Sequence, residues 1–138
     1  MSWTCPECKR TFKKKNQSHS CVNKSLDAHF LKKEPQVRAT YDALENRLKS
    51  IIVFQVSPVV NAIMFTSEST FLAIKPKKRW IDLEFALDYE ANEFPIHKIV
   101  RISKTRFAHF IRIQEPRDID DQLIGWIKKA YELISENV

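Results

Sequence analysis

All three cysteines of this 138-residue chain lie within its first 25 residues, in a segment with few side chains able to form a hydrophobic core. The large apolar residues of this segment are Trp3, Phe12 and Val22. Because ordering the chain costs roughly 1–2 kcal/mol per residue, so small an apolar set cannot fold the segment unaided. The segment is therefore either a flexible tail with free thiols or a module that folds around a metal ion.

The order of the ligand-type side chains favours the metal ion. Cys5 and Cys8 have C-x2-C spacing, and His19 and Cys21 follow after ten intervening residues. Three thiolates and one imidazole suit tetrahedral Zn²⁺, and four protein ligands leave no open position for a substrate. We therefore predict a structural Cys3His zinc site. His29 is an alternative fourth ligand, although it falls in an apolar helical pattern.

The basic charge of the chain is concentrated in the same segment. Residues 1–25 carry six basic side chains and one acidic side chain, a net +5 of the +6 of the whole chain, and the remaining residues are almost balanced. Charge and cysteine content change together near residue 24, which predicts a zinc-binding module over residues 1–24 and a separate domain over residues 25–138. Three consecutive lysines of the module are candidates for contact with nucleic acid or another partner: Lys13, Lys14 and Lys15.

Cysteine usage and hydropathy predict a cytoplasmic protein. An odd number of cysteines in one short segment argues against a secreted disulfide framework and suits a reducing compartment. No apolar run approaches the roughly 18 residues of a membrane span, so no membrane contact is expected. Gly125 is the single glycine of the chain, which excludes a glycine-rich phosphate-binding loop.

Hydrophobic periodicity predicts helices at the two ends of the domain. A short helix is expected over residues 25–33 with Ser25 as its N-cap, and a longer helix is expected to begin at Pro35. The apolar stripe of the longer helix consists of Val37, Tyr41, Leu44, Leu48 and Ile51. A last helix is expected to have Asp118 as its cap and the following stripe: Ile119, Leu123, Trp126, Ile127, Ala130 and Ile134.

Short β-type runs lie between these helices. They cover residues 52–57, 60–66, 70–75, 80–87, 99–103 and 106–113, and no crossover helix separates them. We therefore predict an α+β fold: an antiparallel sheet of about five to six strands packed against N- and C-terminal helices and preceded by the small zinc-stapled module.

If the helices cover one face of this sheet, aromatic and basic side chains gather on the other. Alternation places there Phe71, Lys75, Trp80, Arg101, Arg106, Phe110 and Arg112, and a basic strand-to-strand turn adds Lys77 and Lys78. Such a mixture is typical of surfaces that hold single-stranded nucleic acid by base stacking and phosphate contacts. The alternatives are a solvated face and a face covered by the zinc module or by a second chain.

Three further side chains could carry chemistry. Asp82 and Glu84 share one strand face and could hold Mg²⁺ or move a proton. Cross-strand ion pairs with Lys75 or Arg101 are the plainer interpretation. His109 shares its face with apolar residues, so we expect a hydrogen-bonded core histidine.

The chain also resembles a known group of small bacterial proteins. The N-terminal part of the resemblance is Trp3-Thr4-Cys5-Pro6-x-Cys8, Phe12 and Asn16-Gln17-x-His19-Ser20-Cys21. The later part is Phe71–Lys78, Trp80–Leu83, His109–Arg112 and Asp118–Trp126. In that group a short zinc motif precedes a domain of unknown function. The resemblance implies a bacterial cytoplasmic origin, a Cys3His zinc site and no assigned activity.

These observations support three functional hypotheses. The first is a non-enzymatic, zinc-binding cytoplasmic protein that binds nucleic acid through its basic zinc module and its aromatic-basic sheet face. The second is a protein-interaction adaptor, which an exposed apolar patch of Phe71, Trp80 and Phe110 would favour. The third is a small-molecule-binding or enzymatic α+β domain.

The zinc hypothesis gives a direct prediction for Cys8→Ser. The variant should lose zinc and unfold residues 1–25, while the thermal transition of the following domain stays nearly intact. Metal analysis and thermal denaturation measure the two effects. A single transition in which the whole chain melts together would show that the boundary near residue 24 is wrong.

Overall fold

The computed structural model describes residues 3–4, 11–12 and 26–136. The predicted zinc ligands Cys5, Cys8, His19 and Cys21 lie outside the described residues, as do the Lys13–Lys15 run and the predicted cap Ser25. Two short strands flank part of this segment in the sequence, β1 (Trp3–Thr4) and β2 (Thr11–Phe12). They pair antiparallel, with Trp3 opposite Phe12 and Thr4 opposite Thr11.

The elements that follow form one sheet and two helices. In chain order, the first of these elements are the short 3-10 helix η1 (Asp27–Phe30), α1 (Pro35–Lys49), β3 (Gln55–Pro58), β4 (Ile63–Thr66) and β5 (Thr70–Pro76). The chain continues with β6 (Ile81–Leu87), β7 (Ile96–Arg101), β8 (Phe107–Ile113), η2 (Pro116–Asp118) and α2 (Asp121–Glu136). The sheet has six antiparallel strands in the order β3-β4-β5-β6-β8-β7.

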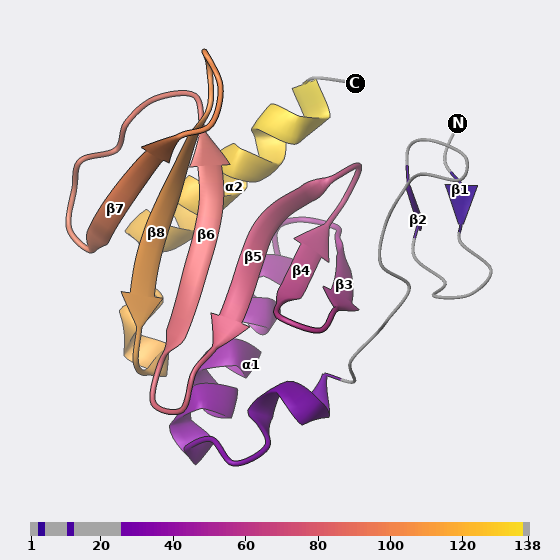
Figure 1. Ribbon diagram of the computed structural model, residues 1–138, viewed down its shortest axis with the longest axis vertical. Coiled ribbons are helices and arrows are strands. Elements are labelled where there is room, and N and C mark those ends of the chain that lie inside the picture. Colours follow the sequence, from indigo (N-terminus) through magenta and orange to yellow (C-terminus); the bar gives the residue numbers. More distant parts are fainter. Residues whose placement is uncertain (1–2, 5–10, 13–25, 137–138) are drawn as a thin grey trace.

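Both helices lie against the same face of the sheet (Figure 1). This arrangement confirms the predicted α+β class and the antiparallel sheet. The other face, which we call the open face, is turned toward the viewer in Figure 1 and carries neither helix. Within the described part of the chain, no helix is both long enough and apolar enough to cross a bilayer.

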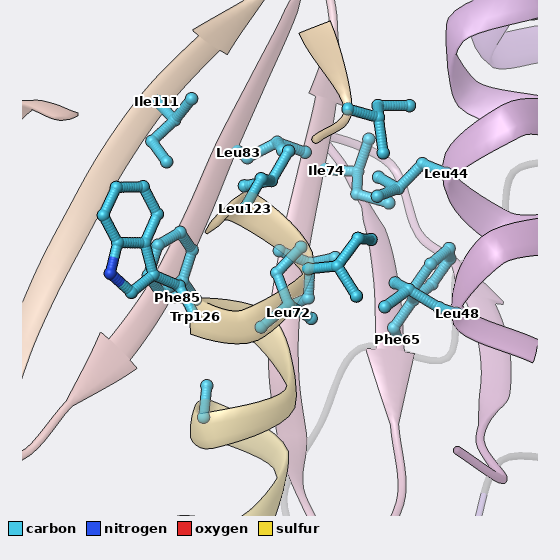
Figure 2. Packing of buried hydrophobic residues seen from close by; sticks show 14 of the residues in the cluster. Leu44, Leu48, Phe65, Leu72, Ile74, Leu83, Phe85, Ile111, Leu123 and Trp126 are labelled. Atoms are coloured by element: carbon cyan, nitrogen blue, oxygen red, sulfur yellow. The ribbon is translucent and has the colours of Figure 1, made fainter. Parts of the chain in front are cut away.

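The strand pattern of β6 shows how the sheet divides apolar from polar side chains. Four alternate residues of β6 are almost fully buried: Ile81, Leu83, Phe85 and Leu87. They pack with sheet residues Phe65 and Leu72, with Leu44 and Leu48 of α1, and with Leu123 and Trp126 of α2 (Figure 2). Each large side chain buried in this way contributes roughly 1.5–3 kcal/mol. The core therefore lies between the helices and one face of the sheet.

Helix α1 begins at Pro35 as the sequence predicts, but its apolar stripe is one residue shorter. Val37, Tyr41, Leu44 and Leu48 are fully buried, whereas Ile51 is 47% exposed. The helix ends at Lys49. After it, the Ile52 N–H donates a hydrogen bond to the Leu48 carbonyl at 2.9 Å. Ile52 is the residue that turns into the core, so the prediction for Ile51 is wrong.

The cap of α2 is Asp120, not Asp118. The Asp120 carboxylate accepts a hydrogen bond from the Leu123 N–H at 2.9 Å, three residues into the helix. Asp118 instead accepts the N–H groups of Gln114 and Glu115 at the separate turn η2. The apolar stripe of α2 is as predicted, with its first five residues buried and Ile134 partly buried.

A β-bulge changes the orientation of Phe71. Phe65 of β4 is opposite Leu72, whereas the next residue, Thr66, is opposite Thr70, so Phe71 is an extra residue in β5. Phe71 is 3% exposed and packs edge-to-face on Tyr131 of α2, with ring centroids 5.4 Å apart. The prediction that Phe71 lies on the open face is therefore wrong.

The strand predicted over residues 99–103 is observed as β7, which begins three residues earlier and ends two residues earlier. The N–H groups of Ile102 and Ser103 both lie within hydrogen-bonding distance of the Arg106 carbonyl, at 3.0 and 3.3 Å, so the chain turns here toward β8. A register shift between Ile96 and Lys98 interrupts the alternation at the start of β7. Because of this irregularity, a period-2 pattern in the sequence does not indicate where the strand begins.

The Asp120 cap predicts a measurable loss of stability in Asp120→Ala. The variant should unfold with a free energy lower by about 1 kcal/mol, because the Leu123 N–H loses its acceptor. Asp120→Asn keeps an acceptor oxygen and is the matched control, with a smaller loss. Urea denaturation measures both, and equal losses in the two variants would contradict the capping role.

Candidate functional site

Two cross-strand rows form the centre of the open face. The strand register places Lys75, Asp82 and Arg112 opposite one another in the first row. The second row consists of Ala73, Glu84, Phe110 and Lys98. Residues opposite one another on neighbouring strands have Cβ atoms about 4.5–5.5 Å apart, so their side chains are in direct reach. Four neighbouring strands of the sheet, β5, β6, β8 and β7, thus bring charged and aromatic groups together.

Both carboxylates of the rows form ion pairs across strands. Asp82 Oδ1 lies 3.2 Å from Arg112 Nε, and Glu84 Oε1 lies 4.0 Å from Lys75 Nζ. The pair with Lys75 confirms the predicted cross-strand ion pairing. The partner of Asp82 is Arg112 and not Arg101.

The aromatic rings of the open face each lie beneath a basic group. The Arg112 guanidinium carbon is 4.3 Å from the centroid of the Trp80 ring, and Lys98 Nζ is 5.4 Å from that of Phe110. Cation–π contacts of this kind contribute about 0.5–1 kcal/mol at exposed sites. Trp80 Nε1 is the one buried side-chain polar atom of the described residues that has no hydrogen-bond partner.

A hollow of about 270 Å³ opens beside Phe110. Its lining residues are Lys75, Lys77, Asp82, Leu83, Glu84, His97, Lys98 and Phe110. Ala86 and Ala108 are opposite each other in the next pair along the same face. The hollow therefore combines an aromatic ring, two carboxylates and several basic groups.

Two residues of this hollow, His97 and Lys98, are not indicated by the sequence pattern. Both are exposed residues of β7, which the expected strand bounds placed further along the chain. After the register shift that follows Ile96, Lys98 and Val100 both lie on the open face. Residues 97–112 contain five basic side chains and no acidic one, and this pattern could have indicated Lys98 as a site residue.

Arg101 does not lie on the open face. It is opposite Phe107, which is itself opposite the buried Leu87, so its side chain belongs to the helix-covered face at the edge strand. Its guanidinium carbon is 5.9 Å from the Phe107 ring centroid. The register shift in β7 causes the difference, because it reverses the alternation that the sequence alone predicts. The expected position of Arg101 is therefore wrong.

The remaining basic candidates lie in turns. Lys77 and Lys78 belong to the β5–β6 turn, which the Lys77 N–H closes by donating to the Trp80 carbonyl at 2.7 Å. Lys78 also accepts the Glu34 N–H through its carbonyl at 2.9 Å, so this turn touches the start of α1. Arg106 lies at the end of the β7–β8 turn, where its Nη1 donates to the Thr105 carbonyl. The basic strand-to-strand turn is thus confirmed.

His109 is a core residue, as predicted. It is fully buried and stacks on Phe85 at a centroid distance of 5.7 Å. Nδ1 lies 2.9 Å from the Phe107 carbonyl, and Nε2 accepts the Ala91 N–H at 2.9 Å. Nδ1 is therefore the protonated nitrogen of a neutral ring, and burial lowers the pKa of His109.

Other candidates for ligand chemistry already have partners. His29 is buried in η1, and its Nε2 lies 2.8 Å from the Val59 carbonyl. Among residues 26–136 and the two short strands, no group of three His, Cys, Asp or Glu side chains could hold a metal ion. A second hollow of about 400 Å³ lies beside η2, and its acidic groups Asp118 and Asp120 already accept backbone N–H groups.

The sequence from residue 26 to residue 134 matches the model of one protein family, described as a domain of unknown function (DUF5655). The chain belongs to this family. The DUF5655 match covers η1, α1, the six-stranded sheet and most of α2. It confirms the expected domain of unknown function. Searches of curated proteins and of solved structures found no match.

The buried His109 of the DUF5655 domain predicts a stability that decreases in mild acid. Its pKa is lowered in the folded state, so below the ordinary value of about 6.5 the unfolded chain binds more protons than the folded one. Protonation of Nε2 would also remove the acceptor of the Ala91 N–H. The free energy of unfolding should therefore fall between pH 7.5 and pH 5.5.

Urea denaturation at the two pH values tests this prediction. His109→Gln should show a smaller loss between pH 7.5 and pH 5.5 than the wild type, because the titrating group is absent. His97→Gln replaces an exposed imidazole on β7 and should retain the wild-type loss. An unchanged pH dependence in His109→Gln would contradict the assignment.

Proposed function

We propose that the DUF5655 domain of this chain is a non-enzymatic module that binds single-stranded nucleic acid on its open face. The observation that carries the proposal is the pairing of half-buried aromatic rings with basic groups: Phe110 with Lys98, and Trp80 with Arg112. Stacking of a base on an aromatic ring contributes about 1–3 kcal/mol per base, and basic side chains contact the flanking phosphates.

Charge on the open face supports a polyanionic partner. Four basic groups, Lys75, Lys77, Lys98 and Arg112, surround the hollow or its rows, against the two carboxylates of Asp82 and Glu84. Asp82 lies 3.2 Å from Arg112 and Glu84 lies 4.0 Å from Lys75, so the two carboxylates offset only part of this charge. The surplus of positive charge lies at the rim, where a nucleic-acid backbone would pass.

The shape of the face favours single strands over duplexes. Reading a duplex requires an element that enters a groove, usually a helix or a two-stranded ribbon. The open face presents instead the broad surface of a sheet, and bases paired within a duplex could not stack on Phe110. Single-stranded nucleic acid exposes its bases for such contacts.

We further propose that residues 1–24 form a zinc-stapled module with Zn²⁺ bound by Cys5, Cys8, His19 and Cys21. The ligand spacing supports it, and so does the antiparallel pairing of β1 and β2, which lie on either side of the C-x2-C motif in the sequence. Reduced cysteines that bind zinc suit a reducing compartment such as the cytoplasm. The metal content of Cys8→Ser tests this part.

With zinc bound, the N-terminal module would keep most of its positive charge. Three thiolates and one Zn²⁺ together contribute about −1, so the net charge of the segment falls from +5 to about +4. Lys13, Lys14 and Lys15 would then add phosphate contacts to those of the open face. In this proposal the two parts of the chain hold the same strand.

The other two functional hypotheses have less support. An exposed apolar patch of Phe71, Trp80 and Phe110 would favour the adaptor hypothesis, but Phe71 lies in the core. The enzymatic hypothesis relies on Asp82, Glu84 and His109, and these are engaged in two ion pairs and in the core. Nucleic-acid binding makes use of the features that remain on the open face.

Binding should be salt-dependent and should decrease in two open-face variants. Fluorescent single-stranded oligonucleotides should bind more tightly than duplexes of the same length, with affinity falling as salt rises. Phe110→Leu keeps an apolar side chain but removes the ring, so affinity should fall about tenfold. Lys98→Gln should weaken binding and reduce the salt slope by about 0.7.

Lys128→Gln is the matched control for Lys98→Gln. It removes the same charge from an exposed position of α2, on the opposite side of the sheet, and should leave affinity unchanged. Absence of binding to any oligonucleotide at low salt would overturn the proposal. Binding that does not depend on salt, or tighter binding of duplexes, would also overturn it.

A further inference from the structure

The centre of the open face contains carboxylates, which a surface made only for phosphates would not need. Asp82 and Glu84 lie among the basic groups of the two central rows and line the hollow beside Phe110. A carboxylate repels a phosphate and attracts groups that donate hydrogen bonds. Whatever occupies this hollow should therefore offer N–H or O–H donors and leave its phosphates at the rim.

We infer that the hollow beside Phe110 selects a guanine base, with Glu84 as the residue that recognises it. This inference rests on the single-strand binding proposed above. Glu84 is directly opposite Phe110 in the β6–β8 register, so a base stacked on the ring would have its edge beside the carboxylate. Single-stranded recognition commonly combines stacking on an aromatic ring with hydrogen bonds to the Watson–Crick edge.

Glu84 is the more available of the two carboxylates. Its side chain is 39% exposed, and its pair with Lys75 is long at 4.0 Å. Asp82 is 28% exposed and accepts a hydrogen bond from Arg112 Nε at 3.2 Å. A ligand can therefore bond to Glu84 without displacing a close partner, which is not the case for Asp82.

The chemistry of the Lys75–Glu84 pair matches guanine better than the other bases. The Watson–Crick edge of guanine presents an acceptor, O6, followed by two adjacent donors, N1–H and N2–H. The two donors fit the two oxygens of Glu84, and Lys75 can donate to O6. Adenine and cytosine offer one amino group on this edge, and uracil offers one N–H between two carbonyls that a carboxylate repels.

The size of the hollow suits one base. Its volume of about 270 Å³ is slightly below the range of roughly 300–1,000 Å³ typical of sites for drug-sized ligands. Neighbouring nucleotides would lie outside it, along the basic groups of Lys77 and Lys98. The site should therefore read one guanine within a strand whose other contacts are independent of sequence.

The test compares oligouridines that differ only at one central position, which is guanosine, inosine, adenosine or cytidine. Affinity of the full-length protein is measured by fluorescence anisotropy at constant salt. The guanosine oligomer should bind about tenfold more tightly than those with adenosine or cytidine. Inosine keeps N1–H and O6 but lacks the N2 amino group, so it should bind with intermediate affinity.

Two variants identify the residue responsible. Glu84→Gln should reduce the preference for guanosine to less than about twofold while oligouridine binding is retained, because only the recognition group changes. Glu132→Gln makes the same change at an exposed position of α2, away from the hollow, and should keep the preference. Thermal denaturation checks that each variant is folded, and the inosine series tests guanine recognition independently of the variants.

The possible outcomes separate this inference from the proposed function. If oligouridine binds in a salt-dependent way but all four central bases bind equally, guanine recognition is wrong and single-strand binding stands. The same conclusion follows if Glu84→Gln retains the preference for guanosine. If no oligomer binds, both the inference and the proposed function are wrong.

Discussion

The structure depends on a sheet that buries only one of its two faces. Helices α1 and α2 both cover the same face, and the alternation in β6 places Ile81, Leu83, Phe85 and Leu87 against them. The same alternation sends Asp82 and Glu84 to the opposite face. Because the strand period is two, the residues that make the core also determine which side chains remain available for a ligand.

The sequence was sufficient for the features that depend on local periodicity. The start of α1 at Pro35, the buried stripe of α2, the alternation of β6 and the core position of His109 were all predicted correctly. Each of these features repeats over several residues and is reinforced by a cap, a proline or a run of apolar side chains.

The errors arose where one residue changes the register or the point at which an element begins. The bulge at Phe71 and the register shift in β7 reverse the alternation, so Phe71 and Arg101 face the helix-covered side and Lys98 joins the open face. The choice of Asp120 over Asp118 as cap depends on the separate turn at η2. These features follow from pairing and packing between different segments of the chain. The hydrophobic periodicity of a single strand carries no information about such contacts.

We propose that single-stranded nucleic acid binds on the open face of the sheet. Titration of the isotopically labelled protein with an oligouridine, followed by two-dimensional amide NMR, tests it residue by residue. We expect the largest shifts at Lys75, Glu84, Lys98 and Phe110, on four different strands. Shifts confined to α1 and α2, or no shifts at a concentration where the oligomer is bound, would contradict it.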